Sequence, residues 1–182
     1  MSSVNKNEEE KMLTEDNEIK VLFLDIDGVL NTMPKLPQSN SNQNNNIQSN
    51  EQHFFAEIRL KRLKQIIDTT KCKIVLSSSW RKRESAKKLL WEKLQSVNID
   101  YNLYYIGDTP SLNETRSFEI YQYVNNSNKY KIINWCAVDD MDLESHNDKY
   151  GKYMKNHFVK TNPSIGLTDA KMNEIIAILQ NK

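Results

Sequence analysis

The chain has 182 residues, 38% of them hydrophobic and 27% charged, with a formal net charge of +1. This length suits one domain with a buried core, and the composition is typical of a soluble globular protein. The near-neutral charge argues against a generally basic nucleic-acid coat and against a membrane-surface protein. No apolar run approaches the roughly 18 residues needed to span a bilayer, so we expect no membrane association.

The stretch 1–18 is polar and acidic, the opposite of a secretory signal, and it lacks periodicity. We expect a disordered tail there, followed by one domain over 19–182 in an intracellular protein, either cytoplasmic or nuclear. Cys72 and Cys136 each lie beside an apolar run, which favours buried thiols over a disulfide.

A continuously apolar strand is predicted over Lys20–Asp25, and its lack of alternation indicates burial on both faces. The following stretch 34–50 is rich in Asn, Gln and Ser and contains two prolines. Such a tract cannot bury enough apolar surface to order itself. We therefore expect a flexible, Asn-rich insertion and not a second domain.

Helix and strand patterns alternate over the rest of the chain. Apolar residues at helical spacing predict helices over 54–69, 83–97, 117–124 and 168–179, the last with Thr168 as its N-cap. Short apolar runs predict strands within 71–80, 101–107, 136–140 and 157–161. This order predicts an α/β fold with a mainly parallel sheet of about five strands and helices on both faces.

Three polar clusters follow predicted strands: Asp25 with Asp27, Ser77–Ser79, and Asp139 with Asp140. Ligands bind at the carboxyl ends of parallel strands, so we expect these clusters to converge on one edge of the sheet. Four carboxylates would repel one another unless a cation lay among them, and oxygen ligands favour Mg²⁺. One aspartate could then act as a nucleophile and its neighbour as an acid, while a hydroxyl and a cationic side chain hold a phosphoryl group.

These residues carry a family resemblance. FLDIDGVL, IVLSSS and AVDD resemble the first, second and fourth motifs of the haloacid dehalogenase (HAD) superfamily, and Arg116 in ETRSFEI best fits the cationic third motif. LSSSWR, RSFEI, VDD and VKTNPSIGLT together resemble the HAD-like domains of multi-enzyme, Swiss Army Knife RNA-repair proteins, over about residues 19–180. The resemblance implies a three-layer, Rossmann-like HAD fold and a Mg²⁺-dependent phosphatase with an aspartyl-phosphate intermediate.

The resemblance also implies a role for each matching residue. Asp25 would be the nucleophile and a metal ligand, and Asp27 the acid and base, with its backbone carbonyl on the metal. Asp139 would ligate the metal directly, and Asp140 would ligate it through water or orient a neighbour. The implied substrate-binding residues are Ser78, Ser79, Arg81 and Arg116.

Each pattern also has a structural interpretation. Ser77 replaces Ser78 if the strand ends one residue earlier, and the Asp139–Asp140 pair also fits a solvated turn or helix cap. Arg116 also fits an ordinary surface or capping arginine. Trp80 is either a core residue or a mark of the repair-type subgroup.

The substrate is inferred from what surrounds the motifs. Neither position where HAD enzymes commonly carry a cap domain holds a folded insertion in this sequence, which by analogy suits a bulky substrate. The basic run 81–88, RKRESAKK, is either a solvated helix face or a track for an anionic polymer. We expect a phosphorylated substrate, with a polynucleotide terminal phosphate favoured. The alternatives are a phosphoprotein or small phosphomonoester, transfer to an acceptor other than water, and a non-catalytic HAD-like binding module.

Overall fold

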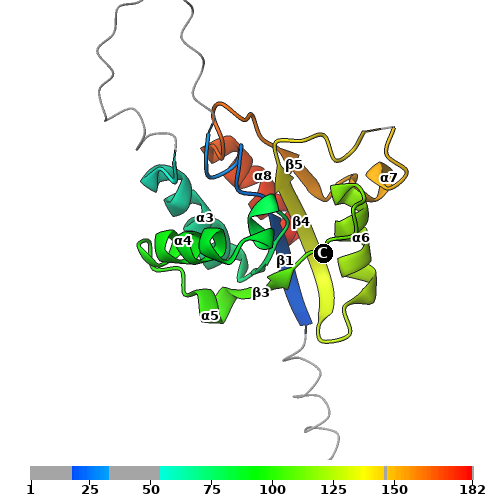
Figure 1. The fold of residues 1–182 in the computed structure, drawn as a ribbon, viewed down its shortest axis with the longest axis horizontal. Helices are drawn as coiled ribbons and strands as arrows, with labels where there is room; N and C mark the ends of the chain where they lie inside the picture. The colour runs from blue at the N-terminus through cyan, green and yellow to red at the C-terminus, as the bar shows by residue number, and fades with distance from the viewer. Residues whose placement is uncertain (1–17, 33–53, 146, 182) are drawn as a thin grey trace, which may run out of the picture.

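The computed structural model describes residues 18–32, 54–145 and 147–181. Its centre is a parallel five-stranded sheet in the order β3-β2-β1-β4-β5 (Figure 1). The strands are β1 (Glu18–Leu24), β2 (Lys73–Leu76), β3 (Tyr105–Asp108), β4 (Lys131–Asp139) and β5 (Phe158–Lys160). The predicted α/β architecture is confirmed.

Helices cover both faces of the sheet, with α3 and α4 on the left of Figure 1 and α6 and α7 on the right. One face carries α3 (Glu57–Thr70), α4 (Glu84–Gln95) and α8 (Asp169–Gln180), and the other carries α6 (Arg116–Asn126) and α7 (Gly151–Met154). The connections contain the short 3₁₀ helix η1 (Ser79–Lys82) and the single-turn helix α5 (Tyr101–Tyr104).

The central strand β1 contributes to two separate hydrophobic cores. Leu22 and Leu24 pack in the core beneath α3, α4 and α8, whereas Val21 and Phe23 pack in the core beneath α6 and α7. All four side chains are fully buried. This explains the unbroken apolar run, because a strand covered on both faces has no solvent-facing side. The layers are helix, sheet and helix.

The element boundaries differ from the predicted ones in four places. The predicted strand 101–107 begins as helix α5, which is capped by the Asp100 carboxylate accepting from Asn102 N at 2.8 Å. β4 begins at Lys131, five residues before the predicted start, and α7 was not predicted at all. Glu18 is the first residue of β1 and belongs to the domain.

Other expectations concern the connecting segments. Apart from Glu18, the predicted tail and the 34–50 insertion lie outside the described residues. The connection from β3 to α6 is only 109–115, so no cap domain stands at that position. Cys72 and Cys136 are both buried free thiols, as expected. In the described part of the chain, no helix is long and apolar enough to cross a membrane.

Candidate active site

The carboxyl ends of β1, β2 and β4 form one edge of the sheet, which we call the rim. Backbone hydrogen bonds continue past the strand ends, since Asp25 N donates to Val138 O at 3.1 Å and Ser77 N donates to Leu24 O at 2.9 Å. The strand order reverses at β1, which is where open α/β sheets bind ligands. The three polar clusters noted in the sequence meet at this rim.

Three carboxylates lie together at the rim. One oxygen atom from each of Asp25, Asp139 and Asp140 lies within 4.8 Å of the others. Asp25 and Asp139 are only 4% and 1% exposed, and Asp140 is half-buried. Clustered carboxylate oxygens suit a hard divalent cation. These three residues, called the acidic trio below, could therefore hold a metal ion.

Arg116 supplies positive charge to the acidic trio. It is the first residue of α6, whose N-cap Thr115 accepts a hydrogen bond from Phe118 N at 3.4 Å. Arg116 Nη1 lies 3.1 Å from Asp25 Oδ1 and also contacts Asp139 Oδ2. The capped end of α6 thus holds one guanidinium between two buried acids.

Burial dominates the electrostatics of this cluster. It raises the pKa of Asp25 from 3.8 to about 7, with Arg116 acting against the rise and Asp139 adding to it. Burial likewise raises the pKa of Asp139, again opposed by Arg116. Burial lowers the pKa of Arg116, but Asp25 and Asp139 outweigh it, and the net direction is upward. The trio is short of positive charge, a deficit that a bound cation relieves.

Asp27 lies beside the trio, with both carboxylate oxygens held. Trp80 Nε1 donates to Asp27 Oδ2 at 2.9 Å, and Asn31 Nδ2 donates to Oδ1 at 3.2 Å. The Trp80 ring is itself buried and packs edge-to-face on Phe55, with ring centroids 5.3 Å apart. Trp80 is therefore a core residue that also orients a carboxylate of the site.

Gly28 allows the loop after β1 to lie against the trio. Its φ is +76°, and a Cβ there would lie 2.4 Å from Asp140 Cγ. Its carbonyl oxygen accepts a hydrogen bond from Thr161 Oγ1 at 2.8 Å, which ties the loop to the end of β5. A side chain at this position would displace Asp140 or the loop.

The three serines after β2 have different surroundings. The Ser78 side chain is fully buried and acts to lower the pKa of Asp25, and its Oγ accepts from Trp80 N at 3.5 Å. Ser77 Oγ is buried with no hydrogen-bond partner among the described residues. Ser79 lines a cleft that opens beside the trio. Ser77 follows the β2 residue that pairs with Leu24, so both Ser77 and Ser78 lie near Asp25, and the choice between them stays a prediction.

Arg81 forms a buried ion pair. Its Nη2 lies 2.5 Å from Glu119 Oε2, and both side chains are 7% exposed. Arg81 Nη1 also donates to Ser78 O at 2.9 Å, and Glu119 Oε1 accepts from Leu112 N at 3.0 Å. The pair connects the segment after β2 to α6. The Arg81 guanidinium, which the family resemblance implied would bind substrate, is therefore already paired within the protein.

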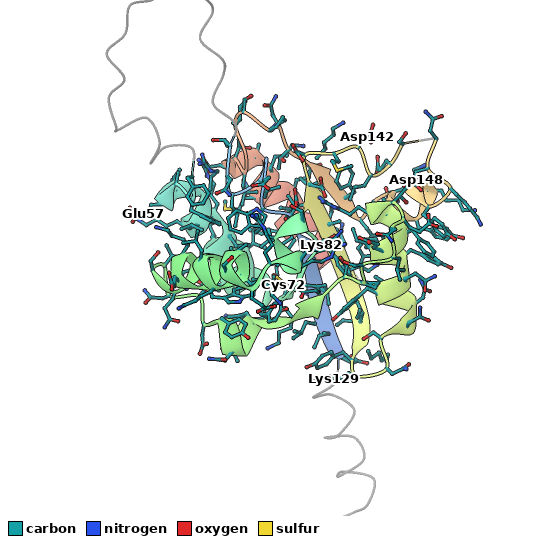
Figure 2. The ribbon with its side chains drawn as sticks, in the orientation of Figure 1. Glu57, Cys72, Lys82, Lys129, Asp142 and Asp148 are labelled. Atoms are coloured by element: carbon teal, nitrogen blue, oxygen red, sulfur yellow. The ribbon has the colours of Figure 1, made fainter. Side chains whose placement is uncertain are left out.

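The cleft beside the trio has a volume of about 500 Å³. Its walls come from η1, the first turn of α6 and the loop after β4. Arg116 and Ser79 line it together with Lys82, Asp142 and Asp148, the last three labelled in Figure 2. A molecule in this cleft would reach the Arg116 guanidinium from solvent.

Some contacts of the site were not anticipated from the sequence. The hydrogen bond from Asn31 to Asp27 joins residues four positions apart at the end of the first motif, a spacing from which a contact could have been inferred. The Arg81–Glu119 pair joins residues 38 positions apart, and no local pattern indicates it.

Residues 21–172 match the family model of the HAD domain in Swiss Army Knife RNA repair proteins. No curated protein and no solved structure matches the chain. The matched range includes Asp25, Asp27, Ser78, Arg116 and the Asp139–Asp140 pair, so it includes the carboxyl end of every strand that contributes to the rim.

Proposed function

Because the chain belongs to the family of HAD domains found in Swiss Army Knife RNA repair proteins, we propose that it is a metal-dependent phosphohydrolase with an aspartyl-phosphate intermediate. The family supports phosphohydrolase activity in general, and the acidic trio could hold a metal ion. The observation that carries the proposal is the position of Asp25. It lies buried at the rim, in contact with Arg116 and Ser78 and beside the other two acids.

The proposed reaction has two displacements at phosphorus. An Asp25 carboxylate oxygen attacks, the bond from phosphorus to the ester oxygen breaks, and Asp27 gives a proton to the departing oxygen. Asp27 then accepts a proton from water as that water attacks the aspartyl-phosphate, which releases inorganic phosphate and restores Asp25. The hydrogen bonds from Trp80 and Asn31 keep the Asp27 carboxyl directed for both proton transfers.

The other rim residues bind the phosphoryl group. In this proposal the Ser78 hydroxyl donates to a phosphoryl oxygen, and the Arg116 guanidinium, which contacts Asp25, offsets the negative charge that gathers there. A bound divalent cation, Mg²⁺ in our proposal, would neutralise further charge on the phosphoryl oxygens. Its proposed ligands are the side chains of Asp25, Asp139 and Asp140 and the backbone carbonyl of Asp27.

For the substrate we propose the terminal phosphate of a polynucleotide. The family description names RNA repair proteins. The connection 109–115 carries no cap domain, so the cleft beside Arg116 is open on that side to a large substrate. A panel of end-phosphorylated oligonucleotides, phosphopeptides and nucleotides would rank these classes by kcat/KM. A higher value for a phosphopeptide or a nucleotide would reject the polynucleotide assignment.

The reaction itself is tested with p-nitrophenyl phosphate, with Mg²⁺ or with EDTA. Asp25→Asn keeps the shape of the side chain but removes the nucleophile, and we expect kcat to fall by about 10³-fold or more. The matched control is Asp68→Asn, because Asp68 is half-exposed and, among the described residues, its ion pair is with Lys64 on α3. Turnover retained in Asp25→Asn would reject the mechanism. No turnover by the wild-type protein would favour a binding module, and phosphate transferred to added alcohols would indicate a phosphotransferase.

A further inference from the structure

α7 lies beside α6 on the right of Figure 1, and aromatic rings from these two helices and the residue before α7 gather there. The Tyr121 ring lies 4.5 Å from Tyr153 and 5.2 Å from Tyr150, measured between centroids. Phe118 lies 4.5 Å from Tyr150 on the side nearer the start of α6. Tyr153 remains 42% exposed. The cluster therefore holds α7 in place and also presents ring surface to solvent.

Two lysines accompany these rings. Lys149 Nζ lies 5.4 Å from the Tyr150 centroid, and Lys152 Nζ lies 5.0 Å from the Tyr153 centroid. Both lysines are exposed, and neither takes part in a salt bridge within the described part of the chain. We call these five residues the tyrosine–lysine face; they are Tyr121, Lys149, Tyr150, Lys152 and Tyr153.

The tyrosine–lysine face adjoins the cleft at the rim. Asn147 and Asp148 line the cleft that contains Arg116, and they also line a cavity of about 310 Å³ shared with Lys149 and Tyr150. Asp148 is labelled on the right of Figure 2 and marks this junction. A chain that extends from Arg116 along the cleft would therefore pass directly onto the face.

Asp148 lines two cavities of opposite charge: the one at the junction holds the carboxylates of Glu114 and Asp148 against Lys149 alone and is net negative. Lys149, Lys152 and Lys155 line the other cavity, of about 480 Å³, in which the carboxylates are those of Glu144 and Asp148. Three cations and two anions leave this second cavity net positive. The Asp148 carboxylate also accepts hydrogen bonds from Ser117 Oγ and from Tyr150 N, which reduces its repulsion of an anion.

The basic run 81–88 fits an anionic polymer less well than the sequence alone indicated. Arg81 is buried against Glu119. Lys87 is only 18% exposed and lies 2.8 Å from Glu84 and 3.5 Å from Asp108. Two of its cations are thus already paired within the fold.

We propose that the tyrosine–lysine face binds the part of a single-stranded polynucleotide that adjoins its terminal phosphate. Bases stack on the rings of Tyr150 and Tyr153, and backbone phosphates lie near Lys149 and Lys152. Alternating aromatic rings and cations suit such a strand, because it presents flat bases and negative charge at short intervals. The inference rests on the proposed function, since it takes the terminal phosphate to lie at Asp25.

The test measures binding and hydrolysis separately. Fluorescence anisotropy follows a single-stranded RNA of about ten nucleotides, and p-nitrophenyl phosphate reports turnover. Lys149→Gln with Lys152→Gln should weaken RNA binding about tenfold and lower the slope of log K against log salt by about 1.4, because each phosphate contact on a single strand contributes about 0.7. Tyr153→Leu should weaken binding by about fivefold or more for RNA and leave an abasic strand of equal length unaffected. Aryl phosphate turnover should not change in either variant.

A matched control is available at the opposite end of the sheet. Lys129 lies 5.0 Å from the Tyr130 centroid, the same arrangement as on the face, and Figure 2 labels it at the bottom of the molecule. Lys129→Gln with Lys131→Gln removes two charges there and should bind RNA like the wild type. Circular dichroism checks that each variant folds. If Tyr153→Leu does not fold, the lysine variants alone test the inference.

Three results would overturn the inference. The first is an equal loss of RNA affinity in the Lys149/Lys152 and Lys129/Lys131 variants, and the second is an equal loss of affinity for RNA and for the abasic strand in Tyr153→Leu. The third is a wild-type protein that hydrolyses aryl phosphate but does not bind RNA. RNA binding at the face without aryl phosphate turnover would instead reject the proposed function while leaving the face as a binding surface.

Discussion

The indole N–H of Trp80 donates to the carboxylate of Asp27 at 2.9 Å, joining residues that are 53 positions apart in the sequence. Trp80 follows β2 and Asp27 follows β1, so this bond connects two loops at the rim. The Trp80 ring is fixed by the core around Phe55. The orientation of the proposed acid and base is therefore set by hydrophobic packing.

Trp80→Phe keeps an aromatic ring in the core and removes this hydrogen bond. We expect kcat for aryl phosphate to fall by roughly 10- to 100-fold, because Asp27 becomes less well directed at the leaving oxygen. The free energy of unfolding should fall by only about 1–2 kcal/mol. Trp91→Phe is the control, since Trp91 packs on Tyr101 and Tyr105 away from the rim. Equal effects of the two substitutions on kcat would contradict this role of Trp80.

Gly28→Ala tests the contact between the first and fourth motifs. The new Cβ would overlap the Asp140 carboxyl and would also occupy a positive-φ conformation. We expect a loss of stability of at least about 2 kcal/mol and a lower affinity for the metal, because Asp140 must move. Thermal unfolding with and without added Mg²⁺ measures both effects. Gly107→Ala is the comparison, since a Cβ there meets nothing closer than 3.5 Å, although its φ is also positive. Unchanged metal affinity in Gly28→Ala would show that Asp140 does not need its present position.

Removing only one partner of the Arg81–Glu119 pair should lower the free energy of unfolding substantially. Glu119→Ala leaves a buried guanidinium without its carboxylate, and we expect a loss of about 3–5 kcal/mol. Arg81→Met combined with Glu119→Leu removes both charges and should recover most of that loss. Urea unfolding of the two variants measures the difference. A Glu119→Ala protein within about 1 kcal/mol of the wild type would show that the pair is effectively solvated.

The raised pKa of Asp25 predicts a pH-dependent stability in the metal-free protein. A buried carboxyl whose pKa rises from 3.8 to about 7 favours folding while it is protonated, and this contribution is lost as the pH rises through about 7. Asp25→Asn does not titrate. In EDTA we therefore expect Asp25→Asn to be more stable than the wild type at about pH 8, by an amount on the order of a few kcal/mol, and to lose this advantage progressively as the pH falls from about 7 towards 3.8.

The measurement is thermal unfolding of both proteins across that pH range. Mg²⁺ should raise the melting temperature of the wild type more than that of Asp25→Asn, because the cation offsets the charge on Asp25. A wild-type protein that gains stability relative to Asp25→Asn as the pH rises in EDTA would contradict the predicted sign.

The fold could be predicted because its determinants are local. The apolar run of β1, the helical spacing in α3 and α8 and the Thr168 cap are all readable over a few residues, and Thr168 Oγ1 accepts from Lys171 N as an N-cap should. Within the predicted strand 101–107, the prediction is right for 105–107 and wrong for 101–104, because the apolar and aromatic residues there fit either state. Asp100 decides the outcome by capping one helical turn before the strand.

The site could be predicted only where functional residues lie close together in the sequence and form a recognisable motif. Asp25 and Asp27 stand two residues apart after a strand, and the meeting of Asp25 with Asp139 follows from parallel topology. The pairing of Arg81 could not be predicted, because Glu119 reaches it only after α6 packs on the sheet. Two side chains that meet only through tertiary packing produce no periodic pattern in the sequence.

The register between β1 and β4 has a consequence for insertions and deletions. The pairing runs without interruption from Lys20 to Leu24, next to the rim, and the register shifts only between Ile19 and Lys20 at the far end. An added or lost residue near Glu18 can be absorbed there, where Ile133 is already half-exposed. The same change between Val21 and Asp25 would exchange the side chains of the two cores and turn the Asp25 carboxylate away from Arg116. Length variation should therefore be tolerated at one end of the central strand and excluded at the other.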